Sequence, residues 1–249
     1  MHGVALITGS SRGIGAATAC LAAQHGYDVC VNYMRDTAAA EEIVGKVRVA
    51  GRCAVAVQAD VACEADIERL FKTADRELGR ITLLVNNAAV VGQSSRRVET
   101  LRAEEVNSLL ATNVTGLIIC AREAILRMST KHGGSGGVIV NVSSASSRIG
   151  AANLWVDYGA SKGAVDSFTI GLAKEVAAEG IRVNAVRPGL IDTDIHAATG
   201  MPERVARVAS MIPMRRAGTA QEVAETIVWL ASAAASYVTG AILDVSGGS

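Results

Sequence analysis

A tyrosine and a lysine four residues apart have the spacing of a proton-transfer pair. Tyr158 and Lys162 stand in the stretch "YGASK" and would share one face of a helix. An ammonium beside a phenol stabilises the phenolate and lowers a pKa that is otherwise about 10. Such a phenol can exchange a proton near neutral pH, as general acid–base catalysis requires. Alone, the pair is more often ordinary helix surface, so its meaning depends on its surroundings.

A second chemical feature is the glycine-rich stretch "TGSSRGIG" at 8–15, which follows an apolar run and precedes a run of small residues that favours a helix. Gly9, Gly13 and Gly15 permit backbone angles closed to other residues and let a ligand approach the main chain. The bare N-terminus of the following helix would then bind pyrophosphate. Tight packing between strand and helix is the alternative, but the position after the first strand favours a dinucleotide site.

Short apolar runs alternate with longer helical patterns along the whole chain, which is typical of parallel βαβ units. The expected strands lie near 4–8, 28–33, 53–59, 81–86, 137–143, 181–187 and 240–245. This order predicts an α/β fold of the Rossmann type: a single domain, 1–249, with a doubly wound parallel sheet of about seven strands and helices on both faces. Ligands bind such sheets at the carboxyl ends of the strands. The stretches 92–100 and 190–213 fit neither sheet nor helix well and are candidate substrate lids.

Composition narrows the possible partners. The chain of 249 residues carries 24 Lys and Arg against 24 Asp and Glu, so its net charge is zero and no strong field attracts nucleic acid or an anionic membrane. Apolar runs are too short for a membrane helix, and we see no signal peptide before the first strand, so we expect a cytoplasmic protein. The cysteines lack metal-binding or disulfide spacing and are expected to be buried free thiols: Cys20, Cys30, Cys53, Cys63 and Cys120. We assign no metal.

Further motifs occur in a recognisable order. After Thr8-Gly9-x-x-x-Gly13-x-Gly15 come "NNAA" at 86–89, "SS" at 143–144, "YGASK" at 158–162 and "RPGLIDT" at 187–193. This series resembles the classical short-chain dehydrogenase/reductase family, including its 3-oxoacyl-[acyl-carrier-protein] reductases and glucose 1-dehydrogenases. The resemblance spans essentially the whole chain. Its one departure is Ala89, where the family usually has glycine.

The resemblance implies a catalytic set of Asn113, Ser144, Tyr158 and Lys162. Tyr158 would exchange the proton, Ser144 would hold the substrate oxygen, and Lys162 would also hydrogen-bond the nicotinamide ribose. From Asn113 a water chain to the lysine is inferred, although an asparagine there could be plain helix surface. Three neighbouring serines are alternatives to Ser144, namely Ser143, Ser146 and Ser147.

The end of the second expected strand bears on the choice of dinucleotide. NAD binders commonly carry a carboxylate there, whereas Tyr33 occupies the position, with Arg35 just beyond and Arg12 in the glycine loop. We therefore expect a preference for NADP(H), with NAD(H) possible, unless both arginines are solvated surface charges or Asp36 competes. The resemblance places the cofactor against Gly9, Ser11, Arg12, Gly13, Ile14, Gly15, Asn32, Tyr33, Arg35, Asp60, Val61, Asn87, Ala88, Ala89, Tyr158, Lys162, Pro188, Gly189, Ile191 and Thr193. Asp60 could instead cap a helix.

The implied reaction is hydride transfer between NADP(H) and a carbonyl or secondary alcohol, with a small-molecule substrate. A 3-oxoacyl thioester and a sugar or polyol both remain open, as does a dinucleotide-binding regulator without activity. The resemblance also favours a homotetramer. Small residues in the expected helical stretches 102–129 and 155–179 would allow close helix contacts, or could pack on the sheet: Ala121, Ala124, Gly159, Ala160, Gly163, Ala164 and Gly171.

Overall fold

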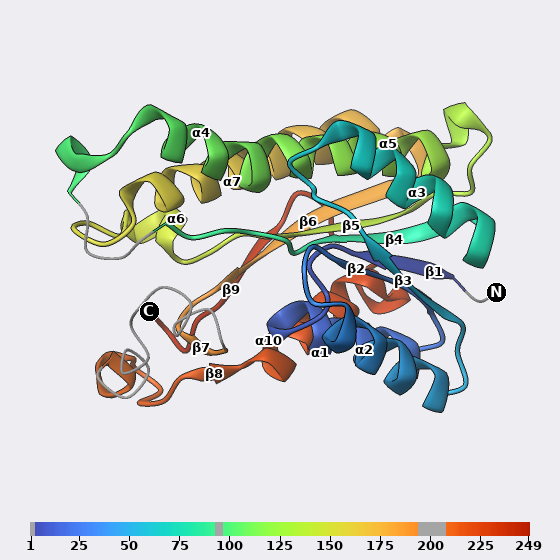
Figure 1. The fold of residues 1–249 in the computed structure, drawn as a ribbon, viewed down its shortest axis with the longest axis horizontal. Coiled ribbons are helices and arrows are strands. Elements are labelled where there is room, and N and C mark those ends of the chain that lie inside the picture. The colour runs from blue at the N-terminus through green and yellow to red at the C-terminus, as the bar shows by residue number, and fades with distance from the viewer. Residues whose placement is uncertain (1–2, 93–96, 194–207) are drawn as a thin grey trace.

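A seven-stranded parallel sheet lies between two layers of helices (Figure 1). The computed structural model describes residues 3–92, 97–193 and 208–249. The strands of the sheet are β1 (Val4–Ile7), β2 (Asp28–Tyr33), β3 (Ala54–Gln58), β4 (Ile81–Asn86), β5 (Gly137–Val142), β6 (Ile181–Pro188) and β9 (Ile242–Val245). Their spatial order is β3-β2-β1-β4-β5-β6-β9, with every neighbouring pair parallel. The winding reverses between β1 and β4, so this is the doubly wound sheet expected from the sequence.

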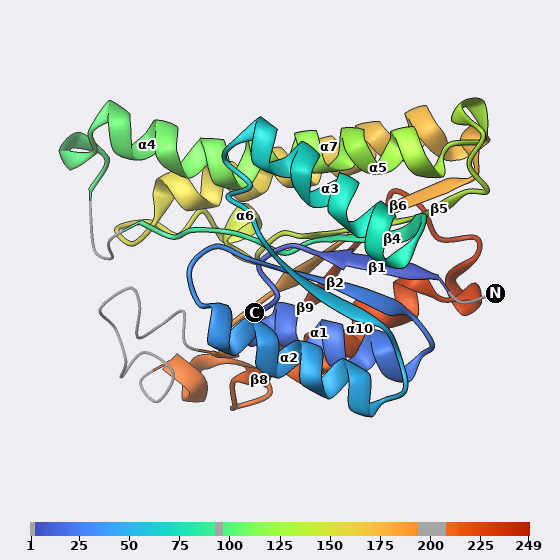
Figure 2. The ribbon, with the colours of Figure 1, turned by 45° about the vertical axis from the view of Figure 1, so that its right-hand side comes forward.

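The helices divide between the two faces of the sheet (Figures 1 and 2). One face carries α1 (Gly13–Gln24), α2 (Thr37–Val49) and α10 (Ala220–Ala231). The other carries α3 (Glu64–Leu78), α4 (Ala103–Leu110), α5 (Leu117–Met128) and α7 (Val156–Val176). The short elements are α6 (Ser146–Ile149), a π-helical turn (Ala111–Gly116), and 3₁₀ turns at Val98–Thr100, Thr130–His132, Ala177–Glu179, Ala209–Met211 and Ala233–Ala235.

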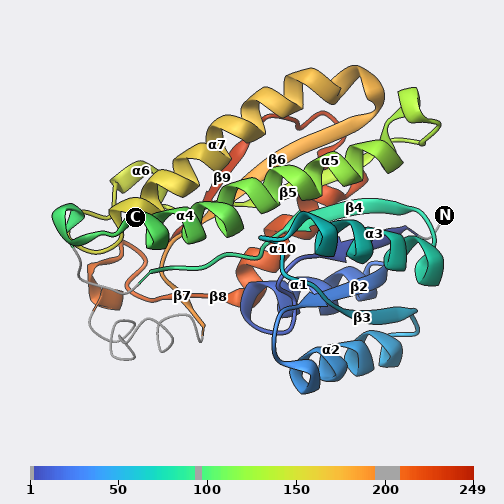
Figure 3. The same ribbon diagram turned by 45° about the horizontal axis from the view of Figure 1, so that its top comes forward.

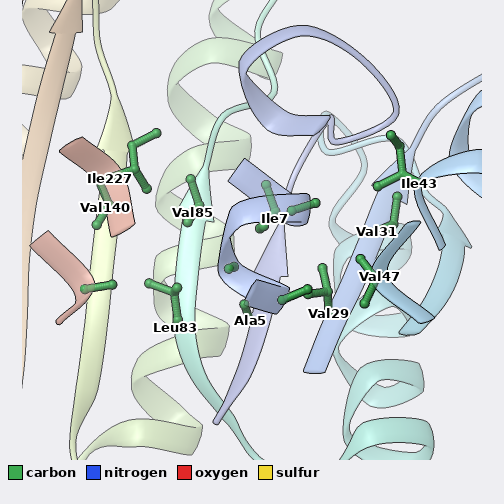
Figure 4. Close-up of a cluster of buried hydrophobic side chains, with 14 of the residues drawn as sticks. Ala5, Ile7, Val29, Val31, Ile43, Val47, Leu83, Val85, Val140 and Ile227 are labelled. Atoms are coloured by element: carbon green, nitrogen blue, oxygen red, sulfur yellow. The ribbon is translucent and has the colours of Figure 1, made fainter. Parts of the chain in front are cut away.

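The strands are apolar on both faces because helices cover both sides of the sheet. Alternate residues of a strand point to opposite faces. On the face in Figure 4, Ala5 and Ile7 of β1 belong to one buried cluster with residues of the neighbouring strands, with Ile43 of α2 and with Ile227 of α10. On the other face, Leu6 packs in a second buried cluster that includes Phe71 of α3. Both clusters hold the sheet rigid beneath the carboxyl ends of its strands.

The long helical stretch Ala103–Met128 departs from the sequence expectation. By length and composition it could cross a membrane, whereas the apolar runs of the sequence were expected to be too short for that. In the fold this stretch lies over the sheet, and Cys120, Ala121 and Ala124 are buried in the cluster that contains Leu84 of β4 (Figure 3). Packing on the sheet therefore accounts for its apolar face.

The expectation of uniformly buried cysteines is wrong for two of the five. Cys30 in β2 and Cys120 in α5 are buried, and burial raises the pKa of each thiol to about 12. Cys20 is partly buried. Cys53, directly before β3, and Cys63, directly before α3, are exposed because each lies in a connection at the edge of the sheet.

The expected lid segments lie only partly within the described residues. Residues 93–96 and 194–207 fall outside them. After β6 the chain forms a short strand, β7 (Ile191–Asp192), which pairs in parallel with β8 (Gly218–Thr219). This two-stranded ladder joins the end of β6 to the start of α10, so the described flanks of the second segment are fixed to the domain.

Candidate active site

The glycine loop folds closely over the carboxyl end of β1. Gly9 and Gly13 have positive φ angles of 62° and 57°, a conformation that favours glycine. A Cβ at Gly15 would lie 2.5 Å from the carbonyl oxygen of Gly9, which is closer than atoms can approach. These glycines therefore allow the loop to turn tightly into α1 and leave its backbone uncovered.

Two asparagine side chains hydrogen-bond to the backbone of the glycine loop. The Asn32 side chain accepts a hydrogen bond from Gly9 N at 3.0 Å and donates to the Ala59 carbonyl at 3.1 Å. Asn87 donates from its amide nitrogen to the carbonyls of Thr8 and Gly9, each at 2.9 Å. Asn32 is 2% exposed, so its side chain supports the loop rather than lining its surface.

The first turn of α1 has the features of an anion site. Its N-cap, Arg12, makes no capping hydrogen bond with its side chain, and the first turn contains no acidic residue. Free backbone N–H groups and the positive end of the helix dipole favour a bound phosphate. Thr193, which follows β7, lies beside Gly13, because a Cβ on that glycine would meet its methyl group at 3.7 Å. The segment after β6 thus borders the same loop.

The end of β2 lacks a carboxylate, as expected. Tyr33 is buried and ends the strand, whereas Arg35 is exposed and, like Arg12, forms no salt bridge within the part of the chain that the structure describes. Asp36 caps α2 by accepting a hydrogen bond from Ala39 N at 2.9 Å. Asp36 therefore serves the helix, and two exposed guanidinium groups remain, that of Arg12 in the loop and that of Arg35 shortly after β2.

Asp60, one of the expected cofactor residues, also lies beside space for a ligand. Asp60 accepts a hydrogen bond from Ala62 N at 2.9 Å, so one of its oxygens closes a turn, while the carboxylate lines an open groove of about 610 Å³. Met34 and Arg69 lie on the same groove. A dinucleotide therefore fits these residues: the loop offers its backbone to phosphates, the exposed Arg12 and Arg35 offer positive charge, and Asp60 lines a groove.

Tyr158 and Ser144 meet across the carboxyl end of β5. The serine is hydrogen-bonded to the phenol, which lowers the pKa of Tyr158, but the larger effect is burial, which raises it. The expectation of a lowered phenol pKa is therefore wrong for this structure. Among the neighbouring serines, Ser143 donates to the Lys162 carbonyl and Ser147 to the Ser144 carbonyl, so the geometry favours Ser144 as the partner of the phenol.

Lys162 is buried beneath Tyr158. Its ammonium lies 5.6 Å from the centre of the phenol ring and donates to the Val142 carbonyl at 2.7 Å. Burial lowers the pKa of Lys162 to about 8, and the negative charge of Asp166 opposes that shift. The lysine therefore carries a proton that it can lose slightly above neutral pH. Because burial is the largest effect on the phenol, the pKa of Tyr158 is raised and not lowered as the sequence suggested.

Asn113 lies in the π-helical turn between α4 and α5 and is 1% exposed. It accepts a hydrogen bond from Val90 N at 2.8 Å and donates to the Val90 carbonyl at 2.9 Å and to Ser161 at 3.1 Å. It thereby ties the chain after β4 to the helix that carries Tyr158. The alternative of an exposed helix-surface asparagine is wrong.

The turn after β6 completes this edge of the sheet. Pro188 accepts a hydrogen bond from Ala145 N at 2.9 Å, and Gly189 donates to the Val245 carbonyl at 3.0 Å. A Cβ at Gly189 would lie 2.8 Å from Cα of Ser246, so only glycine fits this crossing. The structure thus gathers three features at one edge of the sheet: the glycine loop, this turn, and the Tyr158 group, which consists of Asn113, Ser144, Tyr158 and Lys162. That the individual residues contact a cofactor stays a prediction.

Comparisons with known proteins agree with this geometry. The model of a family described as enoyl-(acyl carrier protein) reductase matches residues 9–249. The chain is 53% identical over 245 residues to an uncharacterized oxidoreductase, YgfF, of Escherichia coli, covering 98% of this chain and 99% of that protein. It is 37% identical to a 3-oxoacyl-[acyl-carrier-protein] reductase of Synechocystis (98% and 96% covered) and 38% identical to glucose 1-dehydrogenase 2 of Bacillus subtilis (98% and 93% covered).

Solved structures extend the likeness to the fold. A short-chain type dehydrogenase/reductase from Mycobacterium marinum superposes with a TM-score of 0.91 at 33% identity, covering 99% of this chain and 94% of that one. The chain belongs to the short-chain dehydrogenase/reductase family. A blue fluorescent protein from a metagenomic library, solved in complex with NADPH, superposes with a TM-score of 0.89 at 31% identity, covering 99% and 97% of the two chains.

As a short-chain dehydrogenase/reductase, the chain is an oxidoreductase that acts on CH–OH groups and uses a nicotinamide cofactor.

Two residues that support the site were not predicted from the sequence. The hydroxyl of Thr8 accepts hydrogen bonds from the backbone of Asn87 and Ala88, both at 3.0 Å. Ser161 accepts from Asn113 and donates to the Tyr158 carbonyl at 2.7 Å. Their positions inside two motifs, "TG" and "YGASK", were the available signals.

Proposed function

We propose that this protein is an NADP(H)-dependent reductase of carbonyl compounds, with a 3-oxoacyl thioester as substrate. The observation that carries the proposal is the meeting of Ser144, Tyr158 and Lys162 beside an uncovered glycine loop. When bound, the cofactor supplies the hydride. The protein would supply the proton and the orientation of the substrate.

The protonation state of Tyr158 supports reduction. Because burial raises the pKa of its phenol, the hydroxyl keeps its proton at neutral pH and can donate it to a carbonyl oxygen as the carbon gains hydride. Ser144, already hydrogen-bonded to the phenol, is placed to hold the same oxygen. Lys162 lies behind the ring, where its ammonium favours the phenolate that is left after proton transfer.

The preference for NADP(H) rests on charge. Arg12 and Arg35 are exposed and unpaired among the described residues, and no carboxylate ends β2, so a 2′-phosphate would find cations and no repulsion. The solved neighbour that binds NADPH supports the same choice.

A sugar or polyol is the second candidate substrate, and a specific observation favours it. A pocket of about 340 Å³ beside the chain after β4 is lined by Glu104, Glu105 and Asp157. Carboxylates accept hydrogen bonds from hydroxyl groups and repel anionic carriers. The identities to a 3-oxoacyl reductase and to a glucose dehydrogenase are nearly equal, so sequence similarity favours neither substrate.

The experiment is a substrate panel followed at the absorbance of NADPH. Acetoacetyl thioester and small diketones would be reduced with NADPH, and glucose would be oxidised with NADP⁺. We expect turnover of the thioester, with NADPH preferred to NADH. Turnover of glucose alone would favour the second candidate. If no compound is turned over but NADPH binds tightly, the result would favour a dinucleotide-binding regulator without activity.

We also propose a cytoplasmic homotetramer. On the outer face of α5 and α7, exposed apolar side chains accompany small residues: Ile118, Leu126, Ala160, Ile170 and Gly171. Gly163 and Gly171 have open space where a Cβ would lie, whereas Ala121 and Ala124 pack in the core. Gly171→Arg should lower the molar mass in light scattering. Gly45→Arg, at an equally open site on α2, should leave it unchanged.

A further inference from the structure

A buried ion pair lies one helical turn beyond Lys162. Asp166 is on the same face of α7 and is 8% exposed. Arg187 of β6 donates to its Oδ2 atom from Nε at 3.0 Å and from Nη2 at 2.9 Å. The other carboxylate oxygen, Oδ1, is buried without a hydrogen-bond partner among the described residues. Burying a carboxylate oxygen without a hydrogen bond costs folding free energy, so we looked for a functional role of this carboxylate.

The pair connects two parts of the active site. Asp166 belongs to the helix that carries Tyr158 and Lys162, and Arg187 directly precedes the Pro188–Gly189 turn. No motif from the sequence analysis includes Asp166, and the proposed reaction assigns it no role. The only hydrogen bond that the Lys162 ammonium makes within the described chain is to the Val142 carbonyl.

We propose that Asp166, held in place by Arg187, is a positioning residue that keeps the buried Lys162 charged beneath Tyr158. The effect of Asp166 on the protonation of Lys162 does not depend on the proposed function. Only its consequence for turnover rests on that function.

Electrostatics gives the two members of the pair opposite effects on Lys162. The Asp166 carboxylate lies one helical turn from Lys162 on the same face of α7 and favours the ammonium, which burial disfavours. Arg187 binds that carboxylate through two bonds and so weakens its pull on the lysine. Removing the Asp166 charge should therefore make Lys162 lose its proton at lower pH. Removing the Arg187 charge should release Asp166 toward Lys162 and have the reverse effect.

Other charged groups lie on the elements packed around α7. From β9, Asp244 approaches Arg187 at 3.9 Å. Arg148 of α6 is exposed and bonds to the Ser249 carbonyl. Glu104 and Glu105 of α4 line the pocket with Asp157, at the start of α7. On its own helix, Lys162 faces Tyr158 and Asp166.

The test is a direct titration of Lys162 by NMR, in protein carrying ¹³C-labelled lysine and no added ligand. The chain contains five lysines, and Lys162→Arg identifies the signal. We expect Asp166→Asn to shift the titration downward by roughly one pH unit. Arg187→Gln should shift it upward, whereas Arg187→Lys should leave it near the wild type. Asp28→Asn, which breaks a similarly buried pair with Arg52 near the opposite edge, is the control and should not move it.

A purely structural ion pair would behave differently. Asp166→Asn and Arg187→Gln would then both lower the melting temperature and leave the Lys162 titration unchanged, or shift it in the same direction, and either result overturns the proposal. If Asp166→Asn does not fold, Asp166→Asn/Arg187→Gln removes both charges and should still lower the titration. Because this measurement needs no cofactor or substrate, its failure is distinct from failure of the proposed reaction, which the substrate panel tests.

Discussion

The glycine loop and the Tyr158 group lie at the same edge of the sheet but are built in contrasting ways. The loop offers backbone, bordered by exposed arginines that have no salt-bridge partner in the described part of the chain. The Tyr158 group offers side chains, and Asn113 and Lys162 are almost wholly buried and hydrogen-bonded. The first region is open to a large charged ligand, whereas the second is suited to the transfer of a single proton. Variants in the two regions should therefore fail in different measurements.

The largest effect should come from filling the glycine loop. Gly15→Val places side-chain atoms against the Gly9 carbonyl and Asn87, so the loop cannot keep its shape. We expect NADPH affinity to fall at least ~100-fold, about 2.8 kcal/mol, in a fluorescence titration. The control is Gly45→Ala, in open space on α2, which should bind normally and gain about 1 kcal/mol of stability. Normal binding by Gly15→Val would show that the loop is not the phosphate site.

Removing the Asn113 side chain should affect the second region instead. Asn113→Ala leaves Val90 N and its carbonyl without their partner, which should cost about 1–3 kcal/mol of stability. We expect turnover to fall between about 10- and 100-fold through misplacement of the site, with NADPH affinity nearly unchanged. Asn107→Ala, on the exposed face of α4, is the matched control. An equal loss of NADPH affinity would contradict the separation of the two regions.

The pH dependence should separate activity from stability. In the folded protein burial lowers the pKa of Lys162 to about 8, from 10.5 for the free side chain. Between these values the unfolded chain binds more protons, so the contribution of Lys162 to the free energy of unfolding rises with pH, by up to ~1.4 kcal/mol per unit. Reduction should meanwhile slow about tenfold per unit above pH 8. Lys162→Met should lose both trends, and persistence of either trend would assign it to another group.

The smallest effect should be on the choice of dinucleotide. Arg12→Ala should weaken NADPH about tenfold, the size of one charge-assisted hydrogen bond, and leave NADH unchanged. Arg76→Ala, an exposed arginine on α3, is the control. Equal weakening of both cofactors would place Arg12 at the pyrophosphate rather than at the 2′-phosphate.

The two regions also differ in how far the sequence alone could describe them. The glycine loop and the doubly wound parallel sheet follow from local patterns, and both were predicted. The raised phenol pKa of Tyr158 was not, because burial depends on packing by distant segments. The π-helical turn that buries Asn113 and the exposed positions of Cys53 and Cys63 were missed for the same reason. Local spacing identifies which residues meet, whereas their protonation depends on the whole fold.

The most direct test of the account measures two quantities on Tyr158→Phe. The substitution removes only the phenol oxygen, so NADPH affinity should stay within about threefold of the wild type, less than 1 kcal/mol. Turnover of the best carbonyl substrate from the panel should fall at least ~100-fold through loss of general acid catalysis. Near wild-type turnover in this variant would contradict the account, because the proton would then come from a group other than Tyr158.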